Sequence, residues 1–148
     1  MSRIISYKGT LDMGLEDRIS LATINGKVGY KINKFQLMST TPGVAAYEYV
    51  GKITKVTDPN IGPVVKFTDA DLLAVVFHKA DFSASRTEIG DIIIFDNEKF
   101  NQDIFVNITD ASSGTVPCNY YIELETMDLS ELETTMLTLK NLRTVTSR

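Results

Sequence analysis

The sequence predicts an all-β fold: a jelly-roll-like antiparallel β-sandwich of about eight strands, followed by a short C-terminal α-helix. Apolar residues alternate with polar ones, or form short runs, along most of the chain. Clusters of Gly, Pro, Asn, Asp and Ser separate these segments, as expected for turns. The period becomes helical only after residue 129. These patterns predict the fold class but not the strand order.

A single domain is predicted over residues 1–148, because this length is usual for one domain with one hydrophobic core. Residues 1–12 are predicted to form an extended N-terminal arm with one short strand, Ile4–Tyr7. No apolar run approaches the roughly 20 residues that a membrane-spanning helix needs. The N-terminal residues also lack the pattern of a signal peptide, so we expect no membrane partner.

A β-hairpin is predicted around Asn25-Gly26, since both residue types tolerate a positive φ. Strands over Arg18–Ile24 and Lys27–Met38 flank this turn. The apolar alternation of the second strand changes phase before Phe35, which predicts a β-bulge near Asn33-Lys34.

Further strands are predicted at the remaining apolar segments. These are Ala46–Thr57, Val64–Phe67, Leu72–His78, Ile92–Phe95, Ile104–Thr109 and Asn119–Glu125. The last has the clearest alternation, with Tyr120, Ile122 and Leu124 on one face. The small, polar stretch Lys79–Gly90 predicts a long exposed loop.

The C-terminal helix is predicted over residues 130–142. Ser130 and Glu133 have the spacing of a capping box, in which each side chain binds the other's backbone N–H. Leu132, Met136 and Leu139 then follow helical spacing. This apolar stripe is expected either to cover the sheet or to pack against another subunit.

Charge and cysteine content exclude several classes of function. The net charge is −4 with a pI near 5.0, which argues against a nucleic-acid partner. Residues 1–66 carry +4 and residues 67–148 carry −8, so a subunit with oppositely charged faces is one interpretation and chance scatter is the other. Cys118 is the only cysteine, which excludes an intrachain disulfide and a multi-cysteine zinc site.

The sequence predicts neither an enzyme nor a cofactor, and it assigns no catalytic, cofactor-binding or metal-binding residue. His78 is the only histidine, so a site with two imidazoles is excluded. A Ser-His-Asp triad would have to use His78, yet the chain lacks a Gly-x-Ser-x-Gly motif. We expect an ordinary histidine at the end of a strand.

The stretch DNEKFNQD, residues 96–103, is the richest in oxygen ligands. Asp96, Glu98 and Asp103 invite comparison with a calcium loop, but the EF-hand spacing would put Asn101 where glycine is required. Two alternatives remain: an ion site without EF-hand spacing, and a pair of carboxylates that hydrolyses a glycoside. We favour a structural connection in which Phe100 anchors the loop to the core.

Two further residue sets could form binding surfaces. Exposed aromatic side chains can stack on sugars, and the candidates are Tyr47, Tyr49, Tyr120 and Tyr121. Basic side chains gathered on one sheet face could bind RNA, and the candidates are Lys27, Lys31, Lys34, Lys52, Lys55 and Lys66. Alternating tyrosines are more typical of a half-buried core, and the overall acidity argues against RNA.

Four stretches together carry a resemblance to a known group of proteins: SLATINGKVGYKINKFQLM (20–38), IIFDNEKFNQDIF (93–105), CNYYIELE (118–125) and TLKNLR (138–143). The chain resembles small uncharacterised proteins of uncultured marine bacteriophages over nearly its whole length. The resemblance supplies no catalytic residues. It implies a virion structural protein.

The expected function is therefore that of a phage capsid (coat) or head-decoration subunit that acts by self-assembly. Its partners would be copies of itself, as a homo-oligomer (a trimer or larger), and other virion proteins. It would be located in the virion, after assembly in the host cytoplasm. The alternative is a carbohydrate- or receptor-binding tail module.

Overall fold

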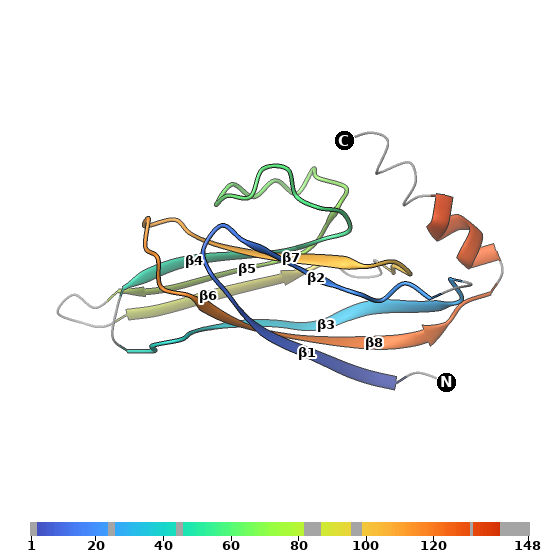
Figure 1. Ribbon diagram of the computed structural model, residues 1–148, viewed down its shortest axis with the longest axis horizontal. Helices are drawn as coiled ribbons and strands as arrows, with labels where there is room; N and C mark the ends of the chain where they lie inside the picture. The colour runs from blue at the N-terminus through green and yellow to red at the C-terminus, as the bar shows by residue number, and fades with distance from the viewer. Residues whose placement is uncertain are drawn as a thin grey trace.

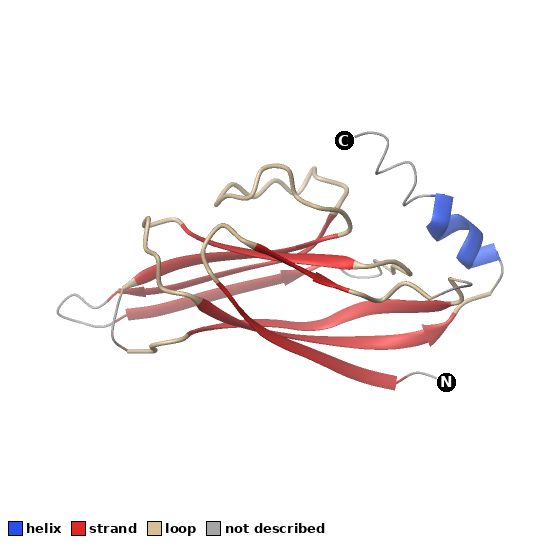
Figure 2. Ribbon diagram, in the orientation of Figure 1, coloured by secondary structure: helices blue, strands red, loops and turns tan. Residues whose placement is uncertain are grey.

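The computed structural model describes residues 3–23, 26–43, 46–81, 87–95, 99–130 and 132–139, and it is an all-β sandwich with one short C-terminal helix. Two antiparallel sheets lie face to face (Figures 1 and 2). The strands are β1 (Arg3–Leu11), β2 (Glu16–Ile19), β3 (Val28–Ser39), β4 (Tyr47–Thr54), β5 (Leu72–Asp81), β6 (Thr87–Ile94), β7 (Ile104–Asp110) and β8 (Cys118–Asp128). The helix covers residues 132–139. The predicted fold class is confirmed.

The strand order is that of a jelly roll with one strand displaced. One sheet has the order β1-β8-β3 and the other β2-β7-β4-β5-β6. A jelly roll is a long antiparallel ribbon wrapped into two sheets, in which β1 pairs with β8, β2 with β7, β3 with β6 and β4 with β5. Here β6 contacts β3 but forms its hydrogen-bonded ladder with β5. The displaced strand therefore extends the second sheet to five strands.

The core fills the space between the two sheets. Phe35 of β3, Tyr49 and Ile53 of β4, and Ile122 and Leu124 of β8 are fully buried and belong to one apolar cluster. Side chains alternate along each strand, so every second residue of these strands points inward. The alternation of apolar and polar residues that predicted the strands therefore also places the apolar side chains in the core.

The N-terminal segment differs from the expected arm. Arg3–Leu11 is one continuous strand that pairs antiparallel with β8 along its whole length. The predicted strand Ile4–Tyr7 is therefore only the middle of a longer edge strand. Burial of Leu11 and partial burial of Ile5 and Tyr7 against the core hold β1 in place.

The predicted hairpin around residues 25–26 is wrong. Strand β2 pairs with β7 and β3 pairs with β8, so the two strands that flank the turn lie in different sheets. Gly26 does have a positive φ of 65°, and Asn25 lies outside the described residues. The predicted bulge is confirmed, because the β3–β8 register shifts between Ile32 and Lys34.

Two predictions in the middle of the chain are also wrong. Val64–Phe67 is part of a loop, not a strand, and both Val64 and Phe67 are exposed. Both ends of the predicted loop Lys79–Gly90 are strand, because β5 continues to Asp81 and β6 begins at Thr87, whereas residues 82–86 lie outside the described residues. Main-chain pairing between β5 and β6 overrides the polar composition there, since a ladder needs no apolar side chains.

The C-terminal helix forms as the capping box predicts. The backbone N–H of Glu133 donates to Oγ of Ser130 at 3.2 Å, and the N–H of Ser130 donates to Oε1 of Glu133 at 3.4 Å. The apolar stripe does not cover the sheet: Leu132, Met136 and Leu139 are 70%, 61% and 57% exposed. Residues 131 and 140–142 of the predicted helix lie outside the described part of the chain.

Candidate functional site

The most developed surface site lies on the outer face of the five-stranded sheet, under the β4–β5 loop (residues 55–71). This loop arches over the side of the sheet that faces away from β1, β3 and β8 (Figure 1). It encloses an open concavity of about 710 Å³, which is within the usual size range of ligand pockets. The lining residues are Lys52, Asp58, Pro59, Asn60, Val64, Lys66, Thr68, Asp69, Ala70, Asp71 and Leu72.

Lys52 is a nearly buried cation in the floor of this concavity. It lies on β4 between Gly51 and Ile53, and its side chain points to the opposite face from the core residue Ile53. Only 8% of the side chain is exposed. Its Nζ donates to the backbone oxygen of Val64 at 3.1 Å and lies 3.5 Å from Oδ2 of Asp58. These two contacts hold the loop against the sheet.

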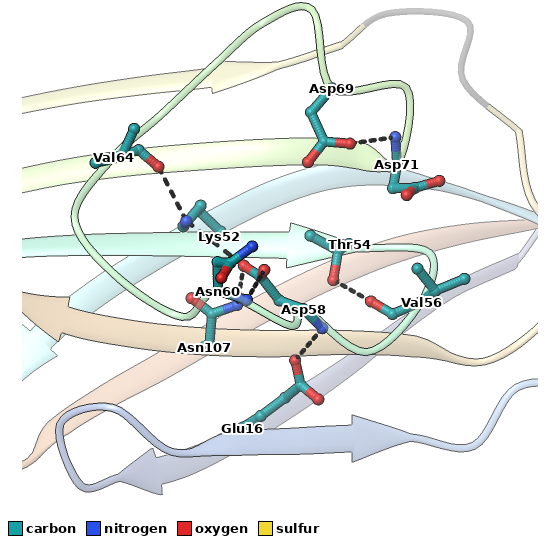
Figure 3. A network of polar contacts seen from close by, with 10 residues as sticks. All are labelled: Glu16, Lys52, Thr54, Val56, Asp58, Asn60, Val64, Asp69, Asp71 and Asn107. Carbon is teal, nitrogen blue, oxygen red and sulfur yellow. Dashed lines mark hydrogen bonds and ion pairs between the residues drawn. The ribbon is translucent and has the colours of Figure 1, made fainter. Parts of the chain in front are cut away.

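Asp58 connects the loop to three strands (Figure 3). Its Oδ1 accepts the N–H of Asn60 at 2.9 Å, which closes a tight turn in the segment DPNIGP. Its Oδ2 accepts from Nδ2 of Asn107 on β7 at 3.4 Å and faces Lys52 on β4. Its own N–H donates to Oε2 of Glu16 on β2 at 3.0 Å.

Asn107 belongs to the same polar cluster and lies in the sheet, under the loop that carries Asp58. It is fully buried on β7, directly opposite Lys52 in the β4–β7 ladder and opposite Glu16 in the β2–β7 ladder. Its Nδ2 binds Asp58, whereas its Oδ1 is buried without a hydrogen-bond partner. A buried amide oxygen without a partner is costly, so this position departs from ordinary structural packing.

The cluster joins an ammonium, a carboxylate and a carboxamide whose side chains are largely buried in the floor of the concavity. Breaking a buried ion pair by removing one partner is strongly destabilising, because the other charge stays buried. The arrangement therefore fastens the loop to the sheet, and it places one carboxylate oxygen beside two side-chain nitrogen atoms.

The sequence analysis considered Lys52 only as one of six candidate lysines and did not single out Asp58. A lysine flanked by apolar residues at a strand position is the one pattern that points to the cluster. Its partner Asn107 could not be found, because the β4–β7 pairing joins segments far apart in the chain.

His78 lies on β5 and not in the concavity. Its Nε2 is 2.8 Å from the hydroxyl of Tyr47, and the two rings pack with centroids 5.2 Å apart. Tyr47 in turn stacks on Tyr49 at 4.3 Å. His78 therefore lies within β5, which continues to Asp81, and not at the end of the strand as expected.

The described part of the DNEKFNQD stretch, residues 99–103, is a structural connection. Phe100 is 4% exposed and exchanges two backbone hydrogen bonds with Tyr30. Asn101 is buried and donates from Nδ2 to the oxygen of Gly26 at 3.1 Å. The prediction that Phe100 anchors this loop is confirmed, whereas Asp96 and Glu98 lie outside the described residues.

Asp103 has its carboxylate occupied by protein donors. Oδ1 accepts the backbone N–H groups of Leu21 and Ala22 at 2.8 and 2.9 Å, and Oδ2 accepts from Nε of Arg18 at 2.6 Å. Burial by itself raises the pKa of Asp103, but these hydrogen bonds outweigh it and lower the pKa below the ordinary 3.8. No group of three or more His, Cys, Asp or Glu suited to a metal occurs among the described residues.

The candidate tyrosines do not form a sugar-stacking surface. Tyr47, Tyr49 and Tyr120 are buried, with 4%, 0% and 6% of their surface exposed. Tyr121 is 36% exposed and lies on the outer face of the three-stranded sheet. The concavity under the β4–β5 loop has no aromatic residue in its lining.

The candidate lysines do not share one face. Lys31 and Lys34 lie on the three-stranded sheet, opposite Glu125 and Glu123 of β8. Lys52 and Lys55 are buried at the five-stranded sheet and its loop, and Lys66 is exposed in the loop. Lys27 precedes β3. The basic sheet face that RNA binding would need is absent from these six positions.

The charge difference between the two halves of the sequence is not a difference between faces. Each sheet contains strands from both halves of the sequence. Their charges pair within the chain, as in Lys31 with Glu125 at 3.4 Å and Lys79 with Glu48 at 3.3 Å. The interpretation as a subunit with oppositely charged faces is therefore not supported.

Cys118 is a buried thiol at the start of β8. Burial raises its pKa to about 12. The thiol is thus protonated at neutral pH and unreactive in the folded protein.

Comparison with known proteins gives no further information on the site. No protein-family model, curated protein or solved structure matches the chain significantly. Within the part of the chain that the structure describes, no helix has the length and hydrophobicity needed to cross a bilayer.

Proposed function

We propose that this protein is a structural subunit of a phage virion, a coat or head-decoration protein that acts by self-assembly. Its partners are copies of itself, in a trimer or larger oligomer, and other virion proteins. The fold supports this role only in general terms, because jelly-roll sandwiches serve many functions, of which forming viral shells is one.

The observation that carries the proposal is the outward-facing apolar stripe of the C-terminal helix. Leu132, Met136 and Leu139 recur at helical spacing, so they lie along one side of the helix. Each has more than half of its surface exposed. Large apolar residues that cluster on a surface mark sites of contact with other proteins. The helix therefore offers a surface that a second subunit would cover.

The three-stranded sheet offers a second surface suited to contact between copies. Strands β1 and β3 form its two edges, and edge strands can pair with another chain. Its outer face presents Lys31 opposite Glu125 and Lys34 opposite Glu123, together with the exposed apolar residues Ile4 and Met38. Because this face carries both positive and negative charges, the same face of a second copy could bind to it, and the pairing of opposite charges would fix how the two copies align.

The proposal is tested by replacing the stripe while keeping the helix. In Leu132→Gln/Met136→Gln, both new side chains are good helix formers, so the helix should persist while its apolar stripe is lost. We expect a smaller oligomer than that of the wild type, measured by light scattering coupled to size-exclusion chromatography. Val64→Gln is the matched control, because Val64 is 66% exposed but lies in the β4–β5 loop. Far-UV circular dichroism verifies that each variant is folded.

Equal assembly of the wild type and the double variant would contradict the role of the stripe. The alternative, a carbohydrate- or receptor-binding tail module, predicts a monomer that binds glycans. Its best candidate surface is the concavity under the β4–β5 loop, where the lining lacks the aromatic residues typical of sugar sites. Glycan-array binding by a monomer would favour this alternative over assembly.

A further inference from the structure

We propose that Lys52 and Asn107 are joined by an intramolecular isopeptide bond, formed without another enzyme and with Asp58 as the proton carrier. The bond would link Nζ of Lys52 to Cγ of Asn107 and would release the side-chain nitrogen of Asn107 as ammonia. This inference is independent of the proposed function, since it concerns covalent chemistry inside one chain.

The positions of the two residues bring the reacting groups together. Lys52 of β4 and Asn107 of β7 are direct partners in an antiparallel ladder, on the outer face of the sheet. Side chains at such positions start from Cβ atoms about 5 Å apart. The bond would therefore need no change in the strands, only a short movement of the flexible lysine side chain.

Asp58 touches both nitrogen atoms that exchange protons. Its Oδ2 lies 3.5 Å from Nζ of Lys52, the nucleophile, and 3.4 Å from Nδ2 of Asn107, the leaving group (Figure 3). A single carboxylate oxygen beside both groups is placed to act first as a general base and then as a general acid, once each contact shortens to the range of about 2.6–3.2 Å that proton transfer needs. The turn that Asn60 closes on Oδ1 fixes the orientation of this carboxylate.

The state of Asn107 also fits the role of acceptor. Its Nδ2 faces Asp58, whereas its Oδ1 is buried without a hydrogen-bond partner. An ordinary structural asparagine at a fully buried position would have both ends satisfied.

The reaction is balanced in atoms and charge. Asp58 takes a proton from the Lys52 ammonium, and the neutral amine attacks Cγ of Asn107 to form a tetrahedral intermediate. Asp58 gives its proton to Nδ2 and accepts one from Nζ, and collapse of the intermediate breaks the Cγ–Nδ2 bond. Ammonia leaves with the remaining proton as ammonium, which returns Asp58 to its carboxylate form. One C–N bond forms, one breaks, and no oxidant or energy source is needed.

Burial of the acceptor favours this chemistry. The Lys52 side chain is 8% exposed, that of Asp58 is 12% exposed and Asn107 is fully buried. The burial of Asn107 limits the access of water to its Cγ, so water competes less with the amine. The product would tie β4 to β7, two strands inside the five-stranded sheet.

Intact-mass spectrometry of the purified, denatured full-length chain tests the proposal. The bond predicts a mass about 17 Da below that of the unmodified sequence, the mass of one ammonia. Trypsin would leave Lys52 uncut and yield a branched peptide that joins residues 35–55 to residues 100–140. Lys52→Arg and Asp58→Ala should each show the full sequence mass, and Lys55→Arg is the control that keeps the loss.

Each other outcome contradicts the proposal. The full sequence mass in the folded wild type would show that Lys52 and Asn107 form only noncovalent contacts. A loss of about 18 Da, one water, with a link from Lys52 to Asp58 would make the carboxylate the acceptor. Because the intact mass and the branched tryptic peptide of the wild type together distinguish these results, misfolding of a variant would not affect the test.

Discussion

Lys52 and Asn107 face each other across the β4–β7 ladder, and one carboxylate oxygen of Asp58 lies within 3.5 Å of both side-chain nitrogens. This relationship places a polar cluster between a sheet and the loop that covers it. Nearby, Val50, Leu72 and Val75 are also buried but lie outside the main core cluster. The polar contacts of Asp58 and Lys52 thus fasten the β4–β5 loop to the outer face of this sheet.

The two partners of the ion pair should differ in their importance for stability. Neither Asp58→Ala nor Lys52→Met can form the proposed isopeptide bond, so the two variants differ in the charge that they leave buried. Asp58→Ala leaves the Lys52 ammonium buried without its carboxylate, so we expect a loss of about 3–5 kcal/mol in the free energy of unfolding. Lys52→Met should cost less, because methionine fills the same space without a charge and Asp58 keeps the N–H of Asn60. Urea unfolding measures both. A larger loss in Lys52→Met than in Asp58→Ala would contradict this description of the cluster.

Asp103 should make stability depend on pH in the acid range. Its folded pKa is lower than its ordinary value of 3.8, so its contribution is fully present above pH 4 and is lost as the pH falls through the folded pKa. Asp103→Asn should therefore destabilise the protein at pH 7, by about 1–3 kcal/mol. The difference from the wild type should shrink toward pH 3. Asp12→Asn, at an exposed position, is the control, and a constant difference at all pH values would argue against the prediction.

Cys118 should react with thiol reagents only after unfolding. Burial raises its pKa to about 12, and its Sγ lies 3.7 Å from the oxygen of Met38. At pH 8 the native protein should label with iodoacetamide far more slowly than the protein in guanidinium chloride. Equal rates in the two conditions would mean that the start of β8 opens readily in the native state.

Gly51 should not tolerate a larger side chain. A Cβ there would lie 2.9 Å from Cγ1 of Val76 and 3.1 Å from Cζ of Phe35, so the two sheets would have to move apart. We expect Gly51→Ala to lower the free energy of unfolding by about 1–3 kcal/mol. Gly62→Ala is the matched control, since the nearest atom to its Cβ is 3.9 Å away. Similar stability of the two variants would refute this packing argument.

The strands could be predicted where local alternation reflects burial. On β8, Tyr120, Ile122 and Leu124 are all buried, as their spacing predicts. The phase change before Phe35 predicted the bulge, because an extra residue is needed to return Phe35 to the core. The capping box predicted the start of the helix because its contacts are all local.

The failures have a common physical cause, which is pairing between distant segments. The Asn25-Gly26 motif is typical of hairpins, but pairing of β2 with β7 and β3 with β8 sends its flanking strands to different sheets. The apolar helix face was identified correctly, yet its exposure depends on which side of the helix meets the body of the protein. The Lys52–Asp58–Asn107 cluster likewise depends on the β4–β7 pairing, which no local pattern encodes.

The central claim is that this β-sandwich acts through contacts between its own copies. Sedimentation equilibrium of the purified full-length protein, from micromolar to millimolar concentration, tests it most directly. We predict a single species with the mass of a trimer or a larger closed oligomer. A mass equal to one chain, 16.4 kDa, at every concentration would contradict the claim.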